Sequence, residues 1–206
     1  MERKTVHIPA KHYEEQIVRR YRNYKLILFT CLAAIGLLFL TLSFSYFTHQ
    51  RLFPEKPLRL HPIFIVNTTI LLFSSIAIEF SKVYFQRDQW KAYKWSHMVF
   101  FSLGLLFLAG QVRAWFILSG IGFGLQHTSA AYLFLISGFH GLHIIGGLIF
   151  YVFFVGSSWK FLHDYTTAVV YFTDPVAKLQ LNLFSLYWHF LGIAWMYLLL
   201  FFVIIR

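Results

Sequence analysis

Apolar positions along the chain gather into long continuous blocks instead of alternating with polar ones. Five such runs lie at about 25–47, 62–84, 95–118, 130–156 and 179–205, with polar segments between them. A helix needs about 20 residues to cross a bilayer core about 30 Å thick. The runs are rich in Leu and Phe, unlike the short alternating strands of a membrane β-barrel. The pattern therefore predicts an all-α, polytopic membrane protein, a bundle of five transmembrane helices.

The segments between the runs are too short for a second domain. We expect a basic, cytoplasmic N-terminal segment over 1–24 and a five-helix transmembrane domain over 25–206. The N-terminal segment lacks a short apolar stretch followed by small residues, so we do not expect a cleaved signal peptide. Loop 157–178 contains Asp174-Pro175, which predicts the start of the last helix, because proline suits a first helical turn.

Lys and Arg residues cluster near the ends of the apolar runs. The chain has 18 Lys and Arg against 8 Asp and Glu, a formal net charge of +10. Thirteen of these cations fall on the side of the N-terminus (seven within 3–25, four within 82–94, and residues 160 and 178) and five on the other. Cytoplasmic loops carry such an excess. The placement predicts a cytoplasmic N-terminus and a periplasmic C-terminus, and it indicates attraction to anionic lipid and no nucleic-acid partner.

Small and polar residues inside the runs share helical faces, which mark where helices meet in lipid. The last run steps by three and four through Ser185, His189, Gly192 and Met196. We expect interhelical contacts from the polar or indole side chains of such faces, namely Asn67, Ser74, His97, Gln111, His140, His143, Trp188 and His189. The last three histidines of that set are expected to tie the fourth run to the fifth.

Histidines on one face also raise the alternative of a metal or heme site. His140 and His143 are three residues apart and could ligate one metal ion, with His97 or His189 as a third ligand. Metal-bound histidines usually have a carboxylate that orients the ring. No such carboxylate is expected at this depth, since Glu79 is expected to pair with Lys82 near the inner end of the second run. We therefore expect no metal, no cofactor and no catalytic residue on this chain.

The single cysteine narrows the possible sites further. Cys31 lies inside the first apolar run, and the chain has no other cysteine. A disulfide within the chain and a cysteine-ligated zinc or iron–sulfur site are therefore both excluded.

Four motifs occur in order along the chain. They are His61-Pro62 with Asn67-Thr68 and Leu71-Leu72-Phe73-Ser74-Ser75; Leu106 to Gln111; Gly138-Phe139-His140-Gly141-Leu142-His143 with Gly146-Gly147; and Tyr187-Trp188-His189-Phe190 with Trp195. Together they resemble subunit III of the heme–copper oxidases, the family of cytochrome c oxidases and quinol oxidases. The resemblance covers about 25–205 and is to the shorter, five-helix bacterial form.

The resemblance implies a non-catalytic subunit of a bacterial respiratory cytochrome c oxidase in the inner membrane. It implies hemes and copper on partner subunits, direct contact with subunit I, and assembly with subunit II and, in some complexes, with subunit IV or a larger respiratory supercomplex; the sequence does not decide membership of a supercomplex. It also implies bound phospholipid, with head groups expected at Arg22 and Lys25 on the inner side and at Arg59, His61 and Arg113 on the outer side. The alternatives are an accessory subunit of a quinol oxidase or nitric oxide reductase, and a free-standing heme or metal protein.

Three positions depart from the family pattern. Ile35, Ala114 and Gly192 stand where the family usually has membrane carboxylates. These losses favour a structural and lipid-binding role over direct proton handling.

Overall fold

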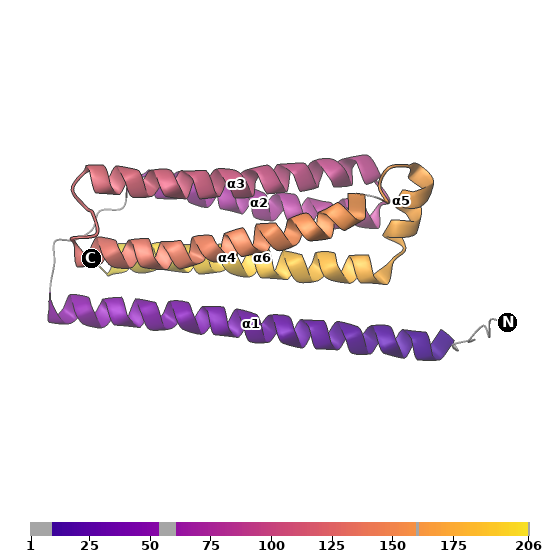
Figure 1. Cartoon of the computed structure of the whole chain (residues 1–206), viewed down its shortest axis with the longest axis horizontal. Coiled ribbons are helices and arrows are strands. Elements are labelled where there is room, and N and C mark those ends of the chain that lie inside the picture. Colours follow the sequence, from indigo (N-terminus) through magenta and orange to yellow (C-terminus); the bar gives the residue numbers. More distant parts are fainter. Residues whose placement is uncertain (1–9, 54–60, 160, 206) are drawn as a thin grey trace, which may run out of the picture.

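The structure is a computed structural model that describes residues 10–53, 61–159 and 161–205 (Figure 1). Within these residues the chain is helical and has no strand. The elements are α1 (Ala10–Leu52), α2 (Ile63–Gln86), α3 (Trp90–Gly120), α4 (Thr128–Trp159), α5 (Tyr165–Phe172) and α6 (Pro175–Ile204). All except α5 are long and apolar enough to cross a membrane. The predicted all-α bundle of five membrane-spanning helices is confirmed.

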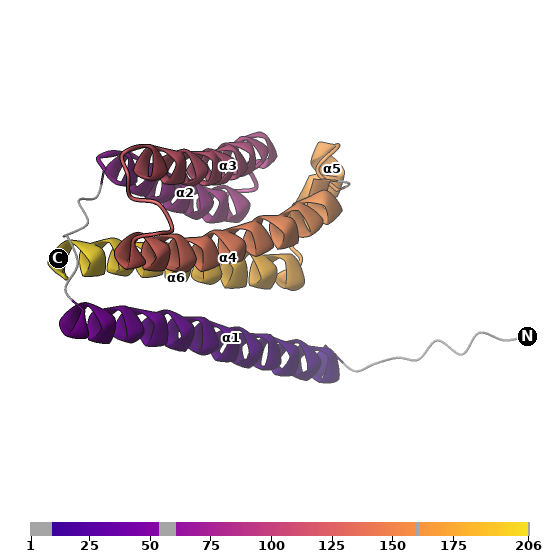
Figure 2. The ribbon, with the colours of Figure 1, turned by 60° about the vertical axis from the view of Figure 1, so that its left-hand side comes forward.

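Helix α6 is the central element of the bundle. It contacts α1, α2 and α4, whereas α3 packs mainly on α2 and α4. Figures 1 and 2 show α2 and α3 as a pair on one side of α4 and α6, and α1 on the opposite side. The two largest fully buried side chains, Trp188 and Trp195, both come from α6. The core therefore forms around the face of α6 that meets α2, α3 and α4.

Helix α1 is attached to the bundle mainly through its C-terminal half. It runs without a break across the boundary predicted at 24/25, so the described part of the basic segment continues the first membrane helix. Side chains 18–27 are all exposed. Farther along, the buried residues Leu32, Phe39 and Tyr46 recur at seven-residue steps, and Tyr46 lies 5.2 Å from Phe202 between ring centroids. This period places one stripe of α1 against the bundle.

Helix α5 lies in a segment that was expected to be a loop, so that part of the expectation is wrong. The helix is too short to show as an apolar run, and it is stabilised by packing: the rings of Tyr171 and Phe172 lie 5.7 and 5.2 Å from Phe85. The chain then turns into α6 at Asp174, whose Oδ1 accepts a hydrogen bond from Val176 N at 2.8 Å. The predicted helix start at Asp174-Pro175 is confirmed.

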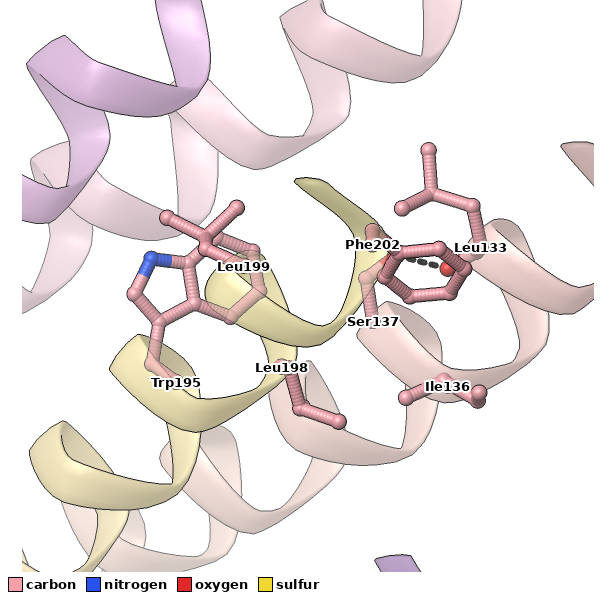
Figure 3. Close-up of a pocket in the computed structure, with 7 residues that line it drawn as sticks. All are labelled: Leu133, Ile136, Ser137, Trp195, Leu198, Leu199 and Phe202. Carbon is pink, nitrogen blue, oxygen red and sulfur yellow. Dashed lines mark hydrogen bonds between the residues drawn. The ribbon is translucent and has the colours of Figure 1, made fainter. Parts of the chain in front are cut away.

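The interior between α4 and α6 is closely packed. A cavity of about 10 Å³ lies there among the seven residues of Figure 3. Ser137 supplies its hydroxyl, which donates to Leu133 O at 2.6 Å and accepts from Trp115 Nε1 at 2.9 Å. Such a volume holds about one water molecule, so helix packing and not a ligand accounts for this part of the core.

Candidate functional site

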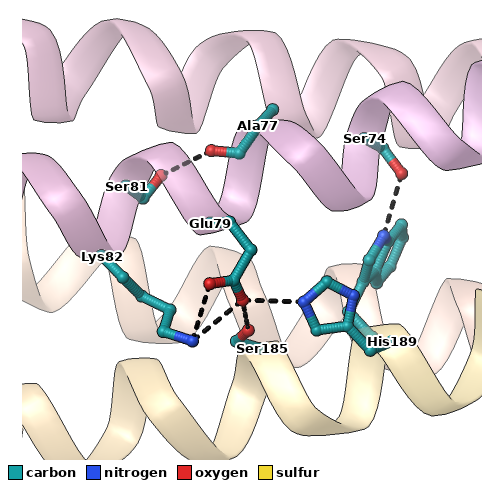
Figure 4. Close-up of polar contacts among 8 residues, drawn as sticks. Ser74, Ala77, Glu79, Ser81, Lys82, Ser185 and His189 are labelled. Carbon is teal, nitrogen blue, oxygen red and sulfur yellow. Dashed lines mark hydrogen bonds and ion pairs between the residues drawn. The ribbon is translucent and has the colours of Figure 1, made fainter.

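A polar cluster joins α2 to α6 inside the membrane-spanning region (Figure 4). Glu79 Oε1 accepts hydrogen bonds from Ser185 Oγ at 2.6 Å and from His189 Nε2 at 2.7 Å. Lys82 Nζ lies 2.9 Å from the same carboxylate, so the predicted pairing of Glu79 with Lys82 is confirmed. One carboxylate thus accepts from three side chains, and two of these belong to α6. Buried or half-buried ions in a membrane protein pair in this way because an isolated charge there is costly.

Two expectations about the histidines of the fourth and fifth apolar runs are wrong. A carboxylate does stand at the depth of an imidazole, because the Glu79 side chain reaches from α2 to His189. His189 therefore ties α6 to α2 and not to α4. The step from Glu79 to Lys82 along one helix is readable from sequence, whereas the contact with His189 crosses between helices 110 residues apart. Only the rotation of the two helices about their axes brings these side chains together.

Tryptophan side chains of α6 make two further bonds to α2. Trp188 Nε1 donates to Ser74 Oγ at 2.9 Å, and both residues are buried. About two helical turns farther along α6, Trp195 Nε1 donates to Thr68 Oγ1 at 3.1 Å. The interhelical role expected of Ser74 and Trp188 is thus a direct contact between them.

His140 lies in the core without a hydrogen bond to any described residue. Its side chain is fully buried, and neither ring nitrogen has a partner. The ring stacks on Trp195 with centroids 5.0 Å apart and an interplanar angle of 29°. His140 therefore ties α4 to α6 through ring packing and not through the expected kind of polar contact.

His143 is half-buried and makes its bond within its own helix. Its Nδ1 donates to Phe139 O at 2.6 Å. Its backbone carbonyl accepts from Tyr187 Oη at 2.8 Å, which does connect α4 with α6. His143 thus contributes to this interface through its main chain.

The face of α6 that carries His189 was predicted to include Met196 among its helix contacts. That part of the prediction is wrong, because Met196 is 48% exposed.

A second buried polar group centres on α3. The His97 ring bonds through Nδ1 to the hydroxyl of Tyr151 on α4. The ring also lies edge-on to Tyr93, with centroids 4.1 Å apart. Gln111, two helical repeats along α3, is buried, and its side-chain amide has no partner among the described residues.

Helices α2 and α3 pack tightly at Asn67. Asn67 is buried beside Gly110, where an added Cβ would overlap the Asn67 amide. Gly104, a further small residue of α3, faces Leu148 of α4 in the same tight manner. Asn67 thus marks a helix contact made possible by the absence of a side chain on its neighbour.

Helix α5 fastens one end of the bundle through hydroxyl groups. Tyr171 Oη lies 2.8 Å from Ser158 Oγ and 3.3 Å from Tyr93 Oη, so a single side chain joins α5 to α4 and α3. Burial raises the pKa of Tyr171 above its usual value, because a phenolate would lose its hydration there.

Four of the five residues expected to meet lipid head groups lie in the described part of the chain. Arg22 and Lys25 are exposed on the N-terminal half of α1, and Lys25 Nζ lies 5.8 Å from the centre of the Phe29 ring. Arg113 is exposed on α3, and His61 lies just before α2, where its Nδ1 accepts from Ile63 N at 3.3 Å. Arg59 lies outside the described residues.

The histidines do not converge on a common point. No group of three His, Cys, Asp or Glu side chains with metal-binding geometry occurs among the described residues. His189 bonds to Glu79 and His143 to its own helix, while His140 stacks on Trp195. The contacts of these three histidines suit helix association.

The positions of the missing carboxylates are filled by packing. Ala114 is fully buried, and Ile35 packs at the edge of the core. Gly192 is buried with its nearest potential Cβ contact, Ser75 Oγ, at 3.6 Å. The structure therefore has a membrane carboxylate at Glu79 but none at these three places.

Comparison with known proteins indicates the same family as the four sequence motifs. The chain is 32% identical over 143 residues to the cytochrome bo(3) ubiquinol oxidase subunit 3 of Buchnera aphidicola subsp. Baizongia pistaciae (strain Bp), covering 66% of each protein. It is 26% identical over 134 residues to the cytochrome c oxidase subunit 3 of Thermostichus vulcanus, covering 65% of this chain and 61% of that one.

A third relative gives a similar result. The chain is 30% identical over 145 residues to a probable cytochrome c oxidase subunit 3 of Nocardia farcinica (strain IFM 10152), covering 69% of this chain and 66% of that one. The matches thus span 61–66% of the length of these three relatives. No protein-family model matches the chain.

Proposed function

The chain belongs to the subunit III family of the heme–copper oxidases, and we propose that it is the non-catalytic subunit III of a bacterial respiratory cytochrome c oxidase. The observation that carries this proposal is its similarity, over about two thirds of its length, to proteins named as subunit 3 of such oxidases. The contacts of its polar residues support a role in helix assembly: Glu79, Ser74 and Thr68 of α2 each accept a side-chain hydrogen bond from α6.

A quinol oxidase is the second candidate for the assembled enzyme. The Buchnera relative is named as a subunit of a ubiquinol oxidase, whereas the Thermostichus relative is named as a subunit of a cytochrome c oxidase. Electron-donor sites are expected on other subunits, so the two candidates differ in the partner and not in the residues of this chain.

The hemes and copper are assigned in this proposal to the partner subunits. Subunit I is the direct neighbour, with subunit II, in some complexes subunit IV, and a larger respiratory supercomplex around it. The broad apolar faces support this, because large exposed residues such as Phe73, Phe116 and Phe153 project from three different helices. Lipid or another subunit would cover them.

Phospholipid binding forms part of the proposal. Arg22 and Lys25 are exposed cations near the start of the first membrane-spanning stretch, where anionic head groups would lie. Arg113 and His61 would meet head groups on the opposite side. The protein would reside in the bacterial inner membrane with its N-terminus in the cytoplasm.

A difference spectrum of the purified chain tests the proposal. The tagged chain would be purified in mild detergent, and again after its partners are stripped, and reduced-minus-oxidised spectra recorded from both. Heme present in the assembly and absent from the isolated chain is the expected result. The position of the α-band would then distinguish an a-type from a b-type partner.

The opposite result would support the third hypothesis. Heme that stays with the isolated chain would make the histidines ligands and would overturn the assignment of cofactors to the partners. Failure of the intact chain to copurify with any heme protein would overturn the proposed function itself.

A further inference from the structure

A cleft opens between α1 and α6 on the side where α1 leaves the bundle. Its volume is about 610 Å³. The walls are formed by α1 between Phe29 and Leu40 and by α6 between Leu186 and Ile193. Binding sites for small molecules are commonly clefts of about 300 to 1,000 Å³ with apolar walls and few polar groups. The cleft matches that description in size and lining.

His189 is the polar side chain of this lining. Its side chain is 35% exposed, and its Nε2 lies 2.7 Å from Glu79 Oε1. A carboxylate only accepts hydrogen bonds, so Nε2 carries a proton. Nδ1 has no hydrogen-bond partner among the described residues; it is an acceptor in the neutral ring and a donor in the imidazolium. Glu79, held by Ser185 and Lys82, fixes the position of the ring.

The depth of His189 restricts the occupant of the cleft. His189 stands near the middle of α6 (Pro175–Ile204), on the order of 20 Å from either end at 1.5 Å per residue. A phospholipid head group stays at the membrane surface, so only its acyl chains would reach this imidazole. Exposing a polar side chain to hydrocarbon is costly. The occupant should therefore carry its own hydrogen-bonding group into the interior of the membrane.

We propose that this cleft binds an isoprenoid quinone or quinol, with a ring oxygen hydrogen-bonded to His189 and the apolar tail along α1. A quinol hydroxyl would donate to Nδ1 of the neutral imidazole, and a quinone carbonyl would accept from the imidazolium. The wall opposite, on α1, has the small residues Ala33 and Gly36.

The proposal concerns binding alone and involves no electron transfer. It goes beyond the proposed function, because a subunit III can support its partner with or without a bound quinone.

Photolabelling of the assembled complex tests the proposal. The complex would be reconstituted in nanodiscs with a ubiquinone analogue carrying a photoreactive group on its ring, and labelled peptides would be identified by mass spectrometry. We expect labels within 29–40 and 186–193, and at least a ten-fold loss of label with excess decylubiquinone. A photoreactive phosphatidylcholine provides the parallel experiment.

Variants make the test specific to the cleft. His189→Phe and Ala33→Leu, which remove the hydrogen bond and fill the space respectively, should each reduce competed labelling at least ten-fold, whereas His189→Gln should retain most of it. His143→Phe is the matched control, since this half-buried imidazole lies on α4 outside the cleft. Copurified heme reports assembly in every sample.

Three results would overturn the proposal. They are equal labelling of wild type and His189→Phe, labelling that decylubiquinone does not displace, and cleft labelling by the phospholipid probe but not by the quinone probe. Each can occur in a complex that retains its heme. Failure of the quinone proposal is thus distinguishable from failure of the proposed function.

Discussion

Glu79 makes two side-chain hydrogen bonds across the contact between α2 and α6. Its carboxylate accepts from Ser185, His189 and Lys82, and its side chain is 44% exposed before any partner is added. Hydrogen bonds between membrane helices contribute modestly, about 0.6 kcal/mol on average and up to roughly 2. Several such bonds to one acceptor should be coupled, because each helps to hold the carboxylate in place for the others.

We expect Glu79→Gln to lower the free energy of unfolding by about 1 to 2 kcal/mol, since Lys82 then lacks its counter-charge. Ser185→Ala should cost about 0.6 kcal/mol. The double variant should lose less than the sum of both. Steric trapping of the unfolded state in bicelles measures the free energy of unfolding of all three variants. Strictly additive losses would show that Ser185 and Glu79 act independently.

His140→Ala should loosen the bundle without altering any absorption spectrum. The variant removes a ring stacked on Trp195, an aromatic contact of about 0.5 to 1.5 kcal/mol beyond its area. The yield of assembled complex should fall several-fold, with an unchanged heme band per assembled complex. Leu142→Ala, on the exposed side of the same helix, is the control. A shifted or missing heme band in the assembled variant would contradict a purely structural role.

At the scale of elements, close approach of helices depends on glycines that only the packed structure distinguishes. Both Gly110 and Gly146 lie within long apolar helices. A Cβ on Gly110 would overlap Asn67, whereas a Cβ on Gly146 would meet nothing within 4 Å. The first glycine allows the close contact between α3 and the Asn67 side chain of α2, and the second lies on an open face.

Gly110→Ala should therefore destabilise the protein by about 1 to 3 kcal/mol, the range for overpacking a tight contact. Gly146→Ala should be neutral or slightly stabilising, because alanine is the better helix former. The midpoint of thermal unfolding in detergent compares the two variants directly. Equal unfolding midpoints for the two variants would contradict a tight contact between Gly110 and Asn67.

Helix α1 should detach at its C-terminal half when its aromatic anchor is removed. Tyr46 is 2% exposed and packs against Tyr132 and Phe202, whereas Phe44 is 68% exposed. Tyr46→Ala should cost about 3 kcal/mol, near the lower end for truncating a buried aromatic ring. Spin labels on α1 and α6 should report a broader distance distribution in Tyr46→Ala than in Phe44→Ala. The same distribution in both would place the anchor elsewhere.

At the scale of the whole molecule, the distribution of charge should fix the orientation in the membrane. Thirteen of 18 Lys and Arg lie on one side of the five spans. The positive-inside rule then places the N-terminus in the cytoplasm and the C-terminus in the periplasm. A C-terminal alkaline phosphatase fusion should be active, and a C-terminal green fluorescent protein fusion should be dark. The reverse pattern would contradict the predicted topology.

The sequence by itself determined the number of membrane helices, their approximate limits apart from the start of α1, the entry into α6 at Asp174-Pro175, and the pairing of Glu79 with Lys82. These features are local: hydrocarbon forces each span to satisfy its backbone within one helix, and neighbours along a helix face follow from its period. The order of the motifs also indicated the family before any fold was known.

Only the tertiary structure decided which helix each polar side chain meets. Helical period places His189 on a face, but the lateral order and rotation of helices decide that this face meets Glu79 of α2 and not α4. Helix α5 is stabilised by the packing of Tyr171 and Phe172 against Phe85, which is distant in sequence. The local sequence pattern does not reveal this packing energy. The cleft between α1 and α6 likewise arises because α1 leaves the bundle, a property of the assembled helices and of neither sequence segment alone.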